Sequence, residues 1–143
     1  MNRNILVISA EETFSVRGLE MKLQGLGVNT SFAQPKLRDV EGKCEDTVLI
    51  VLYIDESVAD GADVLVYLKD YCIAHEEKII VIGGMDEYKT VEQYIPEICI
   101  LRFYERPLDM ARLLDDVEEY LEEASEYERK KSILIVDDDV TYM

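Results

Sequence analysis

The chain has 143 residues, 48% of them apolar, which is enough for one domain with a substantial core. Its 31 Asp and Glu residues outweigh 15 Lys and Arg, and a net charge of −16 repels nucleic acid and anionic lipid, so we expect neither as a direct partner. Three scattered cysteines (Cys44, Cys72, Cys99) and one histidine (His75) argue against a disulfide framework and a zinc site, and predict small buried thiols. No apolar run approaches the ~20 residues of a membrane helix, and the N-terminus lacks the apolar region of a signal peptide. The cytoplasm is therefore the expected location.

Short apolar runs alternate with helical patterns along the chain. In chain order we expect a strand at 5–9, a helix over 16–26, a strand at 28–33, a short helix from Pro35, a strand at 47–54, a helix over 64–72, a strand at 78–84, a helix from Asp86 to Ile95, a strand at 98–104 and a last helix from Pro107. The run at 28–33 is expected near an edge and the run at 47–54 at the centre, because the latter is the most apolar. Asp86 is the expected cap of its helix, and Gly83-Gly84 is expected to mark a turn with unusual backbone angles.

Five strands alternating with five helices predict a parallel sheet covered on both faces. With right-handed crossovers the expected strand order is 2-1-3-4-5, which is the flavodoxin-like doubly wound α/β fold. Ligands of such sheets bind in a crevice at the carboxyl ends of strands 1 and 3. The residues that follow strands 1, 3, 4 and 5 are therefore the candidates for chemistry.

The last helix lacks Gly and Pro from 108 to 131. Leu114, Val117 and Leu121 are expected to face the sheet. A second stripe with 4-3-4-3 spacing resembles a coiled-coil seam and consists of Leu113, Val117, Tyr120, Ala124 and Tyr127. Two heptads do not distinguish such a seam from one wide apolar face, so both interpretations stay open.

The end of the chain repeats its beginning. "ILIVDDDVTYM" (133–143) matches "ILVISAEETFS" (5–15), with Ile5 opposite Ile133. In this alignment Ser9 stands opposite Asp137 and Ala10 opposite Asp138. We expect residues 1–125 to be one domain, 126–131 the end of a helical linker, and 132–143 the first strand of a truncated second domain of the same kind.

Three stretches resemble the receiver domains of response regulators in two-component signalling. They are "ILIVDDD", which resembles the first strand with its acidic pocket; "LIVLYIDESVADGADVLVYL", which resembles the third strand and loop; and "FYERPLDMARLL", which resembles the fifth strand and its Lys-Pro turn. The resemblance implies a pocket in which an acidic pair and a phospho-accepting Asp hold Mg²⁺, while a Ser or Thr and a Lys bind the phosphate. By the same resemblance, the bond between Arg106 and Pro107 is expected to be cis.

When the pocket positions of the family are carried over to this sequence one at a time, the residues found there differ from those of the family. The acidic pair falls on Ser9 and Ala10, the phospho-acceptor on Tyr53, the hydroxyl on Gly83 and the lysine on Arg106. We therefore interpret residues 1–125 as a pseudo-receiver without a catalytic role, metal or cofactor, in which the ring of Tyr53 fills the pocket and its hydroxyl reaches Arg106 or Ser9.

Two alternatives stay open. Asp55 could accept phosphate with Glu11 or Glu12 supplying the metal site, although Asp55 is six residues before Gly61 rather than the eight that the resemblance requires. Alternatively, the crevice could sense a small anion held by Arg106 and the Gly83-Gly84 amides.

The remaining expectations concern partners. The second receiver keeps its acidic pair, Asp137 and Asp138, so Mg²⁺ and a sensor kinase are expected to act there. The first domain is expected to form a homodimer or to bind a partner domain. The candidate interface residues are Tyr94, Arg102, Tyr104, Tyr120 and Tyr127, because Tyr and Arg are common interface anchors.

Overall fold

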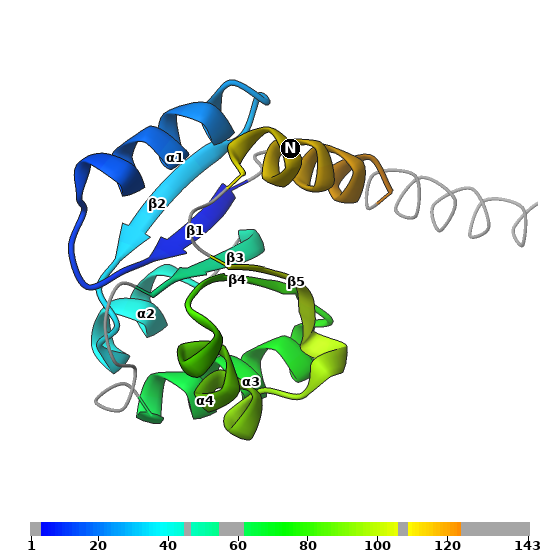
Figure 1. Cartoon of the computed structure of the whole chain (residues 1–143). Coiled ribbons are helices and arrows are strands. Elements are labelled where there is room, and N and C mark those ends of the chain that lie inside the picture. Colours follow the sequence, from blue (N-terminus) through cyan, green and yellow to red (C-terminus); the bar gives the residue numbers. More distant parts are fainter. Residues whose placement is uncertain (1–3, 45–46, 55–61, 106–108, 124–143) are drawn as a thin grey trace, which may run out of the picture. The chain divides into compact units, whose positions relative to one another are not determined.

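The computed structural model describes residues 4–44, 47–54, 62–105 and 109–123 (Figure 1). The chain divides into two compact units, Met1–Met110 and Ala111–Met143, and each is described by itself. The proposed truncated second domain at 132–143, and with it Asp137 and Asp138, lies outside the described residues and stays a prediction.

The first unit is built on a five-stranded parallel sheet in the order β2-β1-β3-β4-β5. Its strands are β1 (Asn4–Ile8), β2 (Asn29–Ala33), β3 (Thr47–Tyr53), β4 (Ile79–Gly83) and β5 (Ile100–Glu105). β2 is an edge strand and β3 lies in the middle, as predicted. The strand order confirms the flavodoxin-like doubly wound fold.

Helices cover both faces of this sheet. They are α1 (Phe14–Gln24), α2 (Leu37–Lys43), α3 (Ala62–His75) and α4 (Met85–Tyr94), with a short 3₁₀ turn, η2 (Glu97–Cys99). In Figure 1, α1 lies on one side of the sheet, and α2, α3 and α4 lie on the other. Thr13 caps α1, since its Oγ1 accepts a hydrogen bond from the Val16 amide at 3.3 Å.

The core follows from the alternation of side chains along the strands. Leu6 and Ile8 of β1 pack in one cluster with apolar residues of α2, α3 and α4, whereas Ile5 and Val7 point to the opposite face. The three cysteines are free and buried, which confirms their interpretation as small core residues.

Three local predictions were wrong. The last strand begins at Ile100 rather than at 98, because η2 occupies Glu97–Cys99 after Pro96. α4 is capped by Gly84 and not by Asp86, which lies inside the helix. Gly83 and Gly84 do not have the unusual backbone angles expected of them; Gly84 is extended, with φ −86° and ψ 166°.

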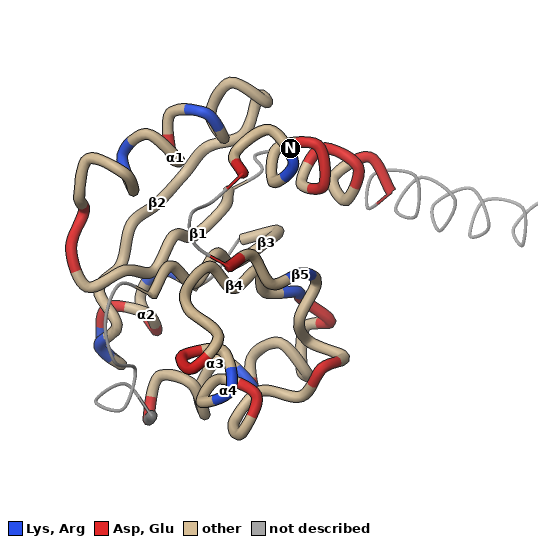
Figure 2. Tube along the Cα trace, in the orientation of Figure 1, with Lys and Arg blue, Asp and Glu red and all other residues tan. Residues whose placement is uncertain are grey.

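The second unit contains a helix whose described residues are 111–123, and the same helix begins one residue earlier, at Met110 of the first unit. Acidic residues follow one another along it (Figure 2). Its buried side chains are Leu113, Val117 and Leu121, whereas Leu114 is only half-buried. Leu113, Val117 and Leu121 follow one another at four-residue steps on one side of the helix, and Leu114 is about 100° further round it. Which of these side chains face the sheet stays a prediction.

Candidate functional site at the carboxyl end of the sheet

The candidate crevice lies where β1 and β3, the strands on either side of the switch in strand order, come to an end. Ile8 pairs with Leu52, and Tyr53 pairs with Ile82. The residues at these strand ends, Ser9, Tyr53 and Gly83, therefore lie along one edge of the sheet. The structure thus brings together three of the five positions carried over from the resemblance, and a fourth, Ala10, is the exposed residue after Ser9.

Ser9 is buried, with 1% of its surface exposed. Its amide donates a hydrogen bond to the Ala33 carbonyl at 3.0 Å, which continues the sheet beyond the end of β1. Its hydroxyl finds no hydrogen-bond partner among the described residues. A buried polar group without a partner costs roughly 1–3 kcal/mol, so this position is polar without being used to stabilise the fold.

Tyr53 is the last residue of β3 and is half-buried. We expected its hydroxyl to reach Ser9 or Arg106. The bond to Ser9 is not formed, because the Ser9 hydroxyl has no partner in the part of the chain that the structure describes. Arg106 and Pro107 lie outside the described residues, so the second arrangement and the cis bond stay predictions.

Gly83 stands where the resemblance places a phosphate-binding hydroxyl. A Cβ at this position would meet the Cβ of Ile54 at 3.2 Å and the Ile54 carbonyl oxygen at 3.4 Å. The glycine is therefore required by a close approach between β4 and the end of β3, rather than by an unusual φ. A side chain has little room at this position.

The amide of Gly84 is already occupied. It donates to Glu87 Oε1 at 3.3 Å, the Glu87 side chain reaching back from the first turn of α4. The anion-sensing alternative required this amide, and a carboxylate stands there instead. The structure therefore occupies one of the two glycine amides that were expected to hold the anion.

The acidic residues after β1 are exposed, and one of them is engaged elsewhere. Glu12 lies 3.8 Å from Arg17, between Oε1 and Nε. Burial, followed by a hydrogen bond and charge repulsion from Glu12, raises the pKa of Glu20 to about 7. No group of three His, Cys, Asp or Glu side chains placed to bind a metal occurs within the described ranges, and Asp55 lies outside them.

Two buried carboxyl groups were missed by the analysis of the sequence, Glu20 and Glu77. Glu20 had a signal, since it lies four residues after Val16 and three before Leu23, on the buried stripe of α1. Glu77 had none, because it lies in the turn before β4, where no periodicity distinguishes inside from outside.

The predicted interface residues differ in exposure. Arg102 is exposed, Tyr94 and Tyr120 are half-buried, and Tyr104 is 8% exposed. Tyr127 lies outside the described residues. Beside them, the rings of Tyr88 and Phe103 stack with their centroids 4.1 Å apart, which joins α4 to β5. Tyr104 therefore contributes little free surface, and Tyr94 and Arg102 are the better candidates of the first unit.

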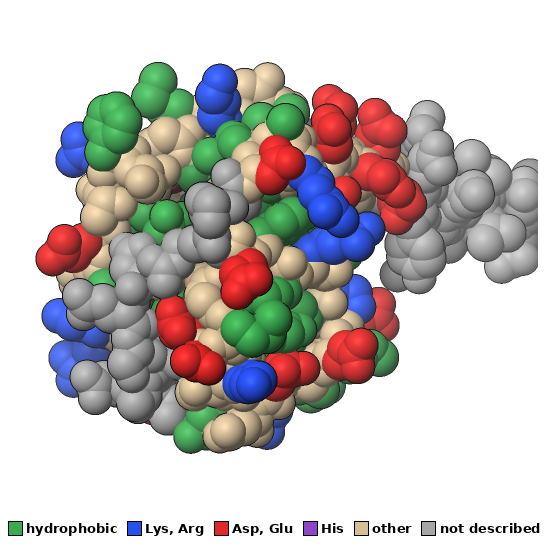
Figure 3. All heavy atoms as spheres, in the orientation of Figure 1, with side chains coloured by type: hydrophobic (Ala, Val, Ile, Leu, Met, Phe, Trp, Pro, Cys, Tyr) green, Lys and Arg blue, Asp and Glu red, His purple; other side chains and the backbone are tan. Residues whose placement is uncertain are grey.

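A second exposed apolar surface was not predicted. Phe14 is 93% exposed and Met21 is 71% exposed, and both belong to α1. They lie seven residues apart, so they share one side of the helix. Figure 3 shows apolar side chains standing out from the surface above this helix.

Comparisons with known proteins identify the fold. No family model and no curated protein matches the sequence. Solved structures do match. A response regulator receiver protein from Pseudomonas putida has a TM-score of 0.63 at 18% identity and covers 83% of this chain and 98% of its own.

Two further solved structures match most of the chain. The beryllofluoride-activated NtrC4 receiver domain dimer has a TM-score of 0.61 at 23% identity, covering 84% of this chain and 97% of its own. A structure described as adenylate cyclase from Rhodopirellula baltica has a TM-score of 0.68 at 14% identity, covering 94% and 98%. The chain therefore has the fold of response-regulator receiver domains. No helix among the described residues is long and apolar enough to span a bilayer.

Proposed function

We propose that residues 1–125 form a non-catalytic receiver-fold module of a two-component signalling protein, which acts by binding a second copy or a partner domain. The observation that carries this proposal is the set of residues at the strand ends. Ser9 follows the last residue of β1, and β3 and β4 end at Tyr53 and Gly83; none of the three is a carboxylate.

Mg²⁺ is a hard cation that binds oxygen ligands and normally needs carboxylates in a protein site. A buried serine hydroxyl, an alanine and a phenol do not offset its charge. Phosphoryl transfer depends on such neutralisation, because negative charge gathers as the phosphoryl group approaches its acceptor. The described residues at the strand ends therefore support a binding role better than a phosphorylation site.

The proposed binding surface includes α4 and β5. The Tyr88–Phe103 stack gives this surface a rigid aromatic base, and Arg102 is exposed beside it. That a receiver-domain dimer is among the matched structures also supports a homodimer. The sensor kinase and Mg²⁺ are proposed to act on the second receiver, in the cytoplasm, with no direct contact of this domain with nucleic acid or membrane.

The test is incubation of the whole chain with acetyl phosphate and Mg²⁺, followed by intact-mass analysis. We expect no phosphoryl adduct, while a competent receiver domain treated in parallel gains one. A phosphoryl adduct that the substitution Asp55→Asn abolishes would overturn the proposal and establish the alternative that uses Asp55 with Glu11 or Glu12.

A matched set of variants tests the missing charges directly. Ser9→Asp, Ala10→Asp and Tyr53→Asp together are expected to create Mg²⁺-dependent thermal stabilisation, because ligand binding to the folded state raises Tm. Tyr53→Asp alone is expected to create none, since one carboxylate rarely holds Mg²⁺. Mg²⁺-dependent stabilisation of the unaltered chain, lost in Asp55→Asn, would contradict the account.

A further inference from the structure

The turn between α3 and β4, at the amino end of the sheet, buries a carboxyl group that the proposed function does not use. Glu77 is 6% exposed. α3 ends at His75, and Glu76 then adopts a left-handed conformation with φ 55°. The Glu77 amide donates to the Cys72 carbonyl at 3.1 Å, which closes the end of the helix and turns the Glu77 side chain inward.

If the Glu77 carboxyl is ionised, the single proton of the Thr47 hydroxyl faces two acceptor groups, Glu77 and the Cys44 carbonyl. Thr47 Oγ1 lies 2.8 Å from Glu77 Oε1, 3.0 Å from Glu77 Oε2 and also 2.8 Å from the Cys44 carbonyl oxygen. A hydroxyl has one proton, so Thr47 can donate to Cys44 or to Glu77 but not to both. With Glu77 ionised, one of these short contacts brings two lone pairs together.

Protonation of Glu77 satisfies every group in this set. The carboxyl then donates to Thr47 Oγ1, and Thr47 donates to the Cys44 carbonyl, which also accepts from the Tyr71 hydroxyl at 2.7 Å. The chain Glu77–Thr47–Cys44 then joins the α3–β4 turn to the start of β3 and the end of α2. One proton therefore completes a link between three elements.

The burial of Glu77 also favours its protonated form. Burial raises the pKa of Glu77 to about 7 and outweighs two effects that lower it, the hydrogen bond with Thr47 and the charge of His75 on the same turn. Lys78 donates its Nζ to the Ile98 carbonyl in η2 and not to Glu77. Towards α2 and α3, Glu77 adds to burial in raising the pKa of Cys44 and of Tyr71 to about 12. The other titratable groups of this region, Cys72, Glu76 and Cys99, offer no cation among the described residues.

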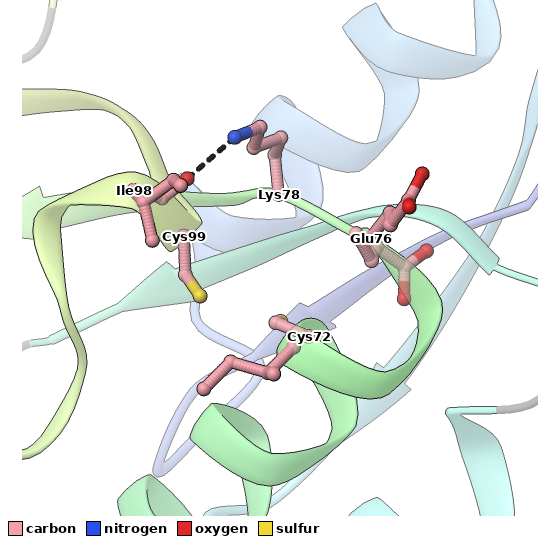
Figure 4. A pocket seen from close by; sticks show the side chains of 7 residues that line it. Cys72, Glu76, Lys78, Ile98 and Cys99 are labelled. Carbon is pink, nitrogen blue, oxygen red and sulfur yellow. Dashed lines mark hydrogen bonds between the residues drawn. The ribbon is translucent and has the colours of Figure 1, made fainter.

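A cavity of about 440 Å³ adjoins the turn. Its lining residues are Cys72, Ile73, Glu76, Glu77, Lys78, Ile98 and Cys99. Figure 4 shows Cys72 on α3 and Cys99 on η2 on opposite sides of this space, with Lys78 reaching across to Ile98. Both thiols are buried, at 1% and 3% exposure. The two thiols are therefore largely shielded from solvent in this structure.

We propose that Glu77 is a proton-controlled latch: while protonated it holds the α3–β4 turn against Thr47 and Cys44, and when it loses the proton the turn is released and the cavity opens. A carboxyl whose folded-state pKa of about 7 exceeds the reference value of 4.5 binds a proton in the closed state that it loses on opening. The closed form is thus fully favoured below about pH 4.5. Its advantage declines as the pH rises through 7.

The experiment is thiol labelling of the whole chain with iodoacetamide at pH 6 and pH 8, with peptide mapping to separate Cys72 and Cys99 from Cys44. The key variant is Glu77→Gln, whose amide donates to Thr47 as the protonated acid does but cannot ionise. At pH 8 we expect Cys72 and Cys99 to be labelled about ten-fold or more faster in the unaltered chain than in Glu77→Gln. Comparison at one pH cancels the intrinsic ionisation of the thiols.

Glu76→Gln is the matched control, since Glu76 is the exposed neighbour with no part in the buried chain of hydrogen bonds. It is expected to label like the unaltered chain at both pH values. Equal labelling of the unaltered chain and Glu77→Gln at pH 8 overturns the latch, and so does a change in Glu76→Gln as large as that in Glu77→Gln.

Hydrogen exchange of the unaltered chain tests the latch without any substitution. Exchange of the Glu77 amide, which is bonded to Cys72, is followed by NMR between pH 5 and 7. A constant opening equilibrium gives an exchange rate that rises about ten-fold per pH unit, and loss of one proton on opening gives a steeper rise, towards about a hundred-fold. A ten-fold rise would contradict the latch.

Discussion

The two ends of the same sheet differ in whether their buried polar groups are hydrogen-bonded. At the carboxyl end, Ser9 is buried with a hydroxyl that has no partner among the described residues. At the amino end, Glu77 is buried with Thr47 within hydrogen-bond distance of both of its oxygens. A buried polar group without a partner is a cost to the fold, whereas one inside a satisfied network links the elements that surround it.

The proposed function accounts for this difference. In the receiver family that the sequence resembles, the carboxyl end holds charges that bind metal and phosphate. By the resemblance, Ser9, Ala10 and Tyr53 stand at those positions, and under the proposed function the Ser9 hydroxyl no longer belongs to a site. The amino end carries no role in the resemblance, yet it contains the more completely bonded group. Substitutions at both ends of the sheet test this contrast.

The largest effect is expected for the pH dependence of stability. Because the pKa of Glu77 is raised to about 7 from 4.5, its contribution is fully present below about pH 4.5 and is lost as the pH rises through 7, by about 3 kcal/mol. Glu20, with a pKa also raised to about 7, acts in the same direction. Urea unfolding from pH 5 to 8 measures how much each carboxyl contributes to the pH dependence of the free energy of unfolding. The unaltered chain is compared with Glu77→Gln and Glu20→Gln. An unchanged pH profile in Glu77→Gln would refute its assignment.

Gly83→Thr restores the hydroxyl that the resemblance expects at the carboxyl end. We expect a loss of about 1–3 kcal/mol, because the new Cβ stands 3.2 Å from Ile54 and the strand cannot move away from it freely. Gly18→Ala is the control: a Cβ there meets nothing within 4 Å, and the helix gains up to about 1 kcal/mol. Chemical denaturation compares the two, and a neutral Gly83→Thr would show that the strand ends can separate.

Thr47→Val removes the hydroxyl that joins Glu77 to the Cys44 carbonyl. At pH 6 we expect a loss of about 1–2 kcal/mol, since the buried carboxyl keeps its proton but loses its acceptor. Thr47→Ser keeps the hydroxyl and is expected to recover most of that loss. If Thr47→Val is as stable as the unaltered chain while Thr47→Ser is not, the methyl packing of Thr47 matters and the hydrogen bonds do not.

Most of the fold could be predicted because it depends on patterns that a sequence displays directly. The runs at 47–54 and 78–84 are apolar on both faces, which is typical of parallel strands covered by helices, and both were found as β3 and β4. The structure differs from the prediction at two places that depend on local features. The 3₁₀ turn η2 makes β5 begin later than expected, and Glu87 rather than Asp86 accepts the hydrogen bond from the amide at the start of α4.

The candidate site was predictable only in part, for a physical reason. Strand ends follow from periodicity, so Ser9, Tyr53 and Gly83 were placed at the right edge. Hydrogen bonds between strand ends depend on distances that periodicity does not contain, and the expected bond from Tyr53 to Ser9 is not formed. The proton-dependent chain from Glu77 joins residues 30 positions apart and left no trace in the sequence.

Ser9→Ala is expected to have the smallest effect and the opposite sign to Thr47→Val. Removing a buried hydroxyl that has no partner should stabilise the fold by about 0.5–1 kcal/mol, provided that the site holds no ligand. Thermal unfolding in the presence and absence of Mg²⁺ is the measurement. A destabilised Ser9→Ala variant would mean that this hydroxyl has a role that the described residues do not show.

The central claim is that the carboxyl-end crevice no longer binds metal and phosphoryl groups. Its most direct test is a titration of the whole chain with Mg²⁺ and beryllium fluoride, a mimic of the phosphoryl group, monitored by ¹⁹F NMR and thermal unfolding. We predict no bound fluoride signal and no change in Tm. A saturable fluoride signal that requires Mg²⁺ and disappears in Asp55→Asn would contradict the claim, because it would show a working acceptor two residues beyond Tyr53.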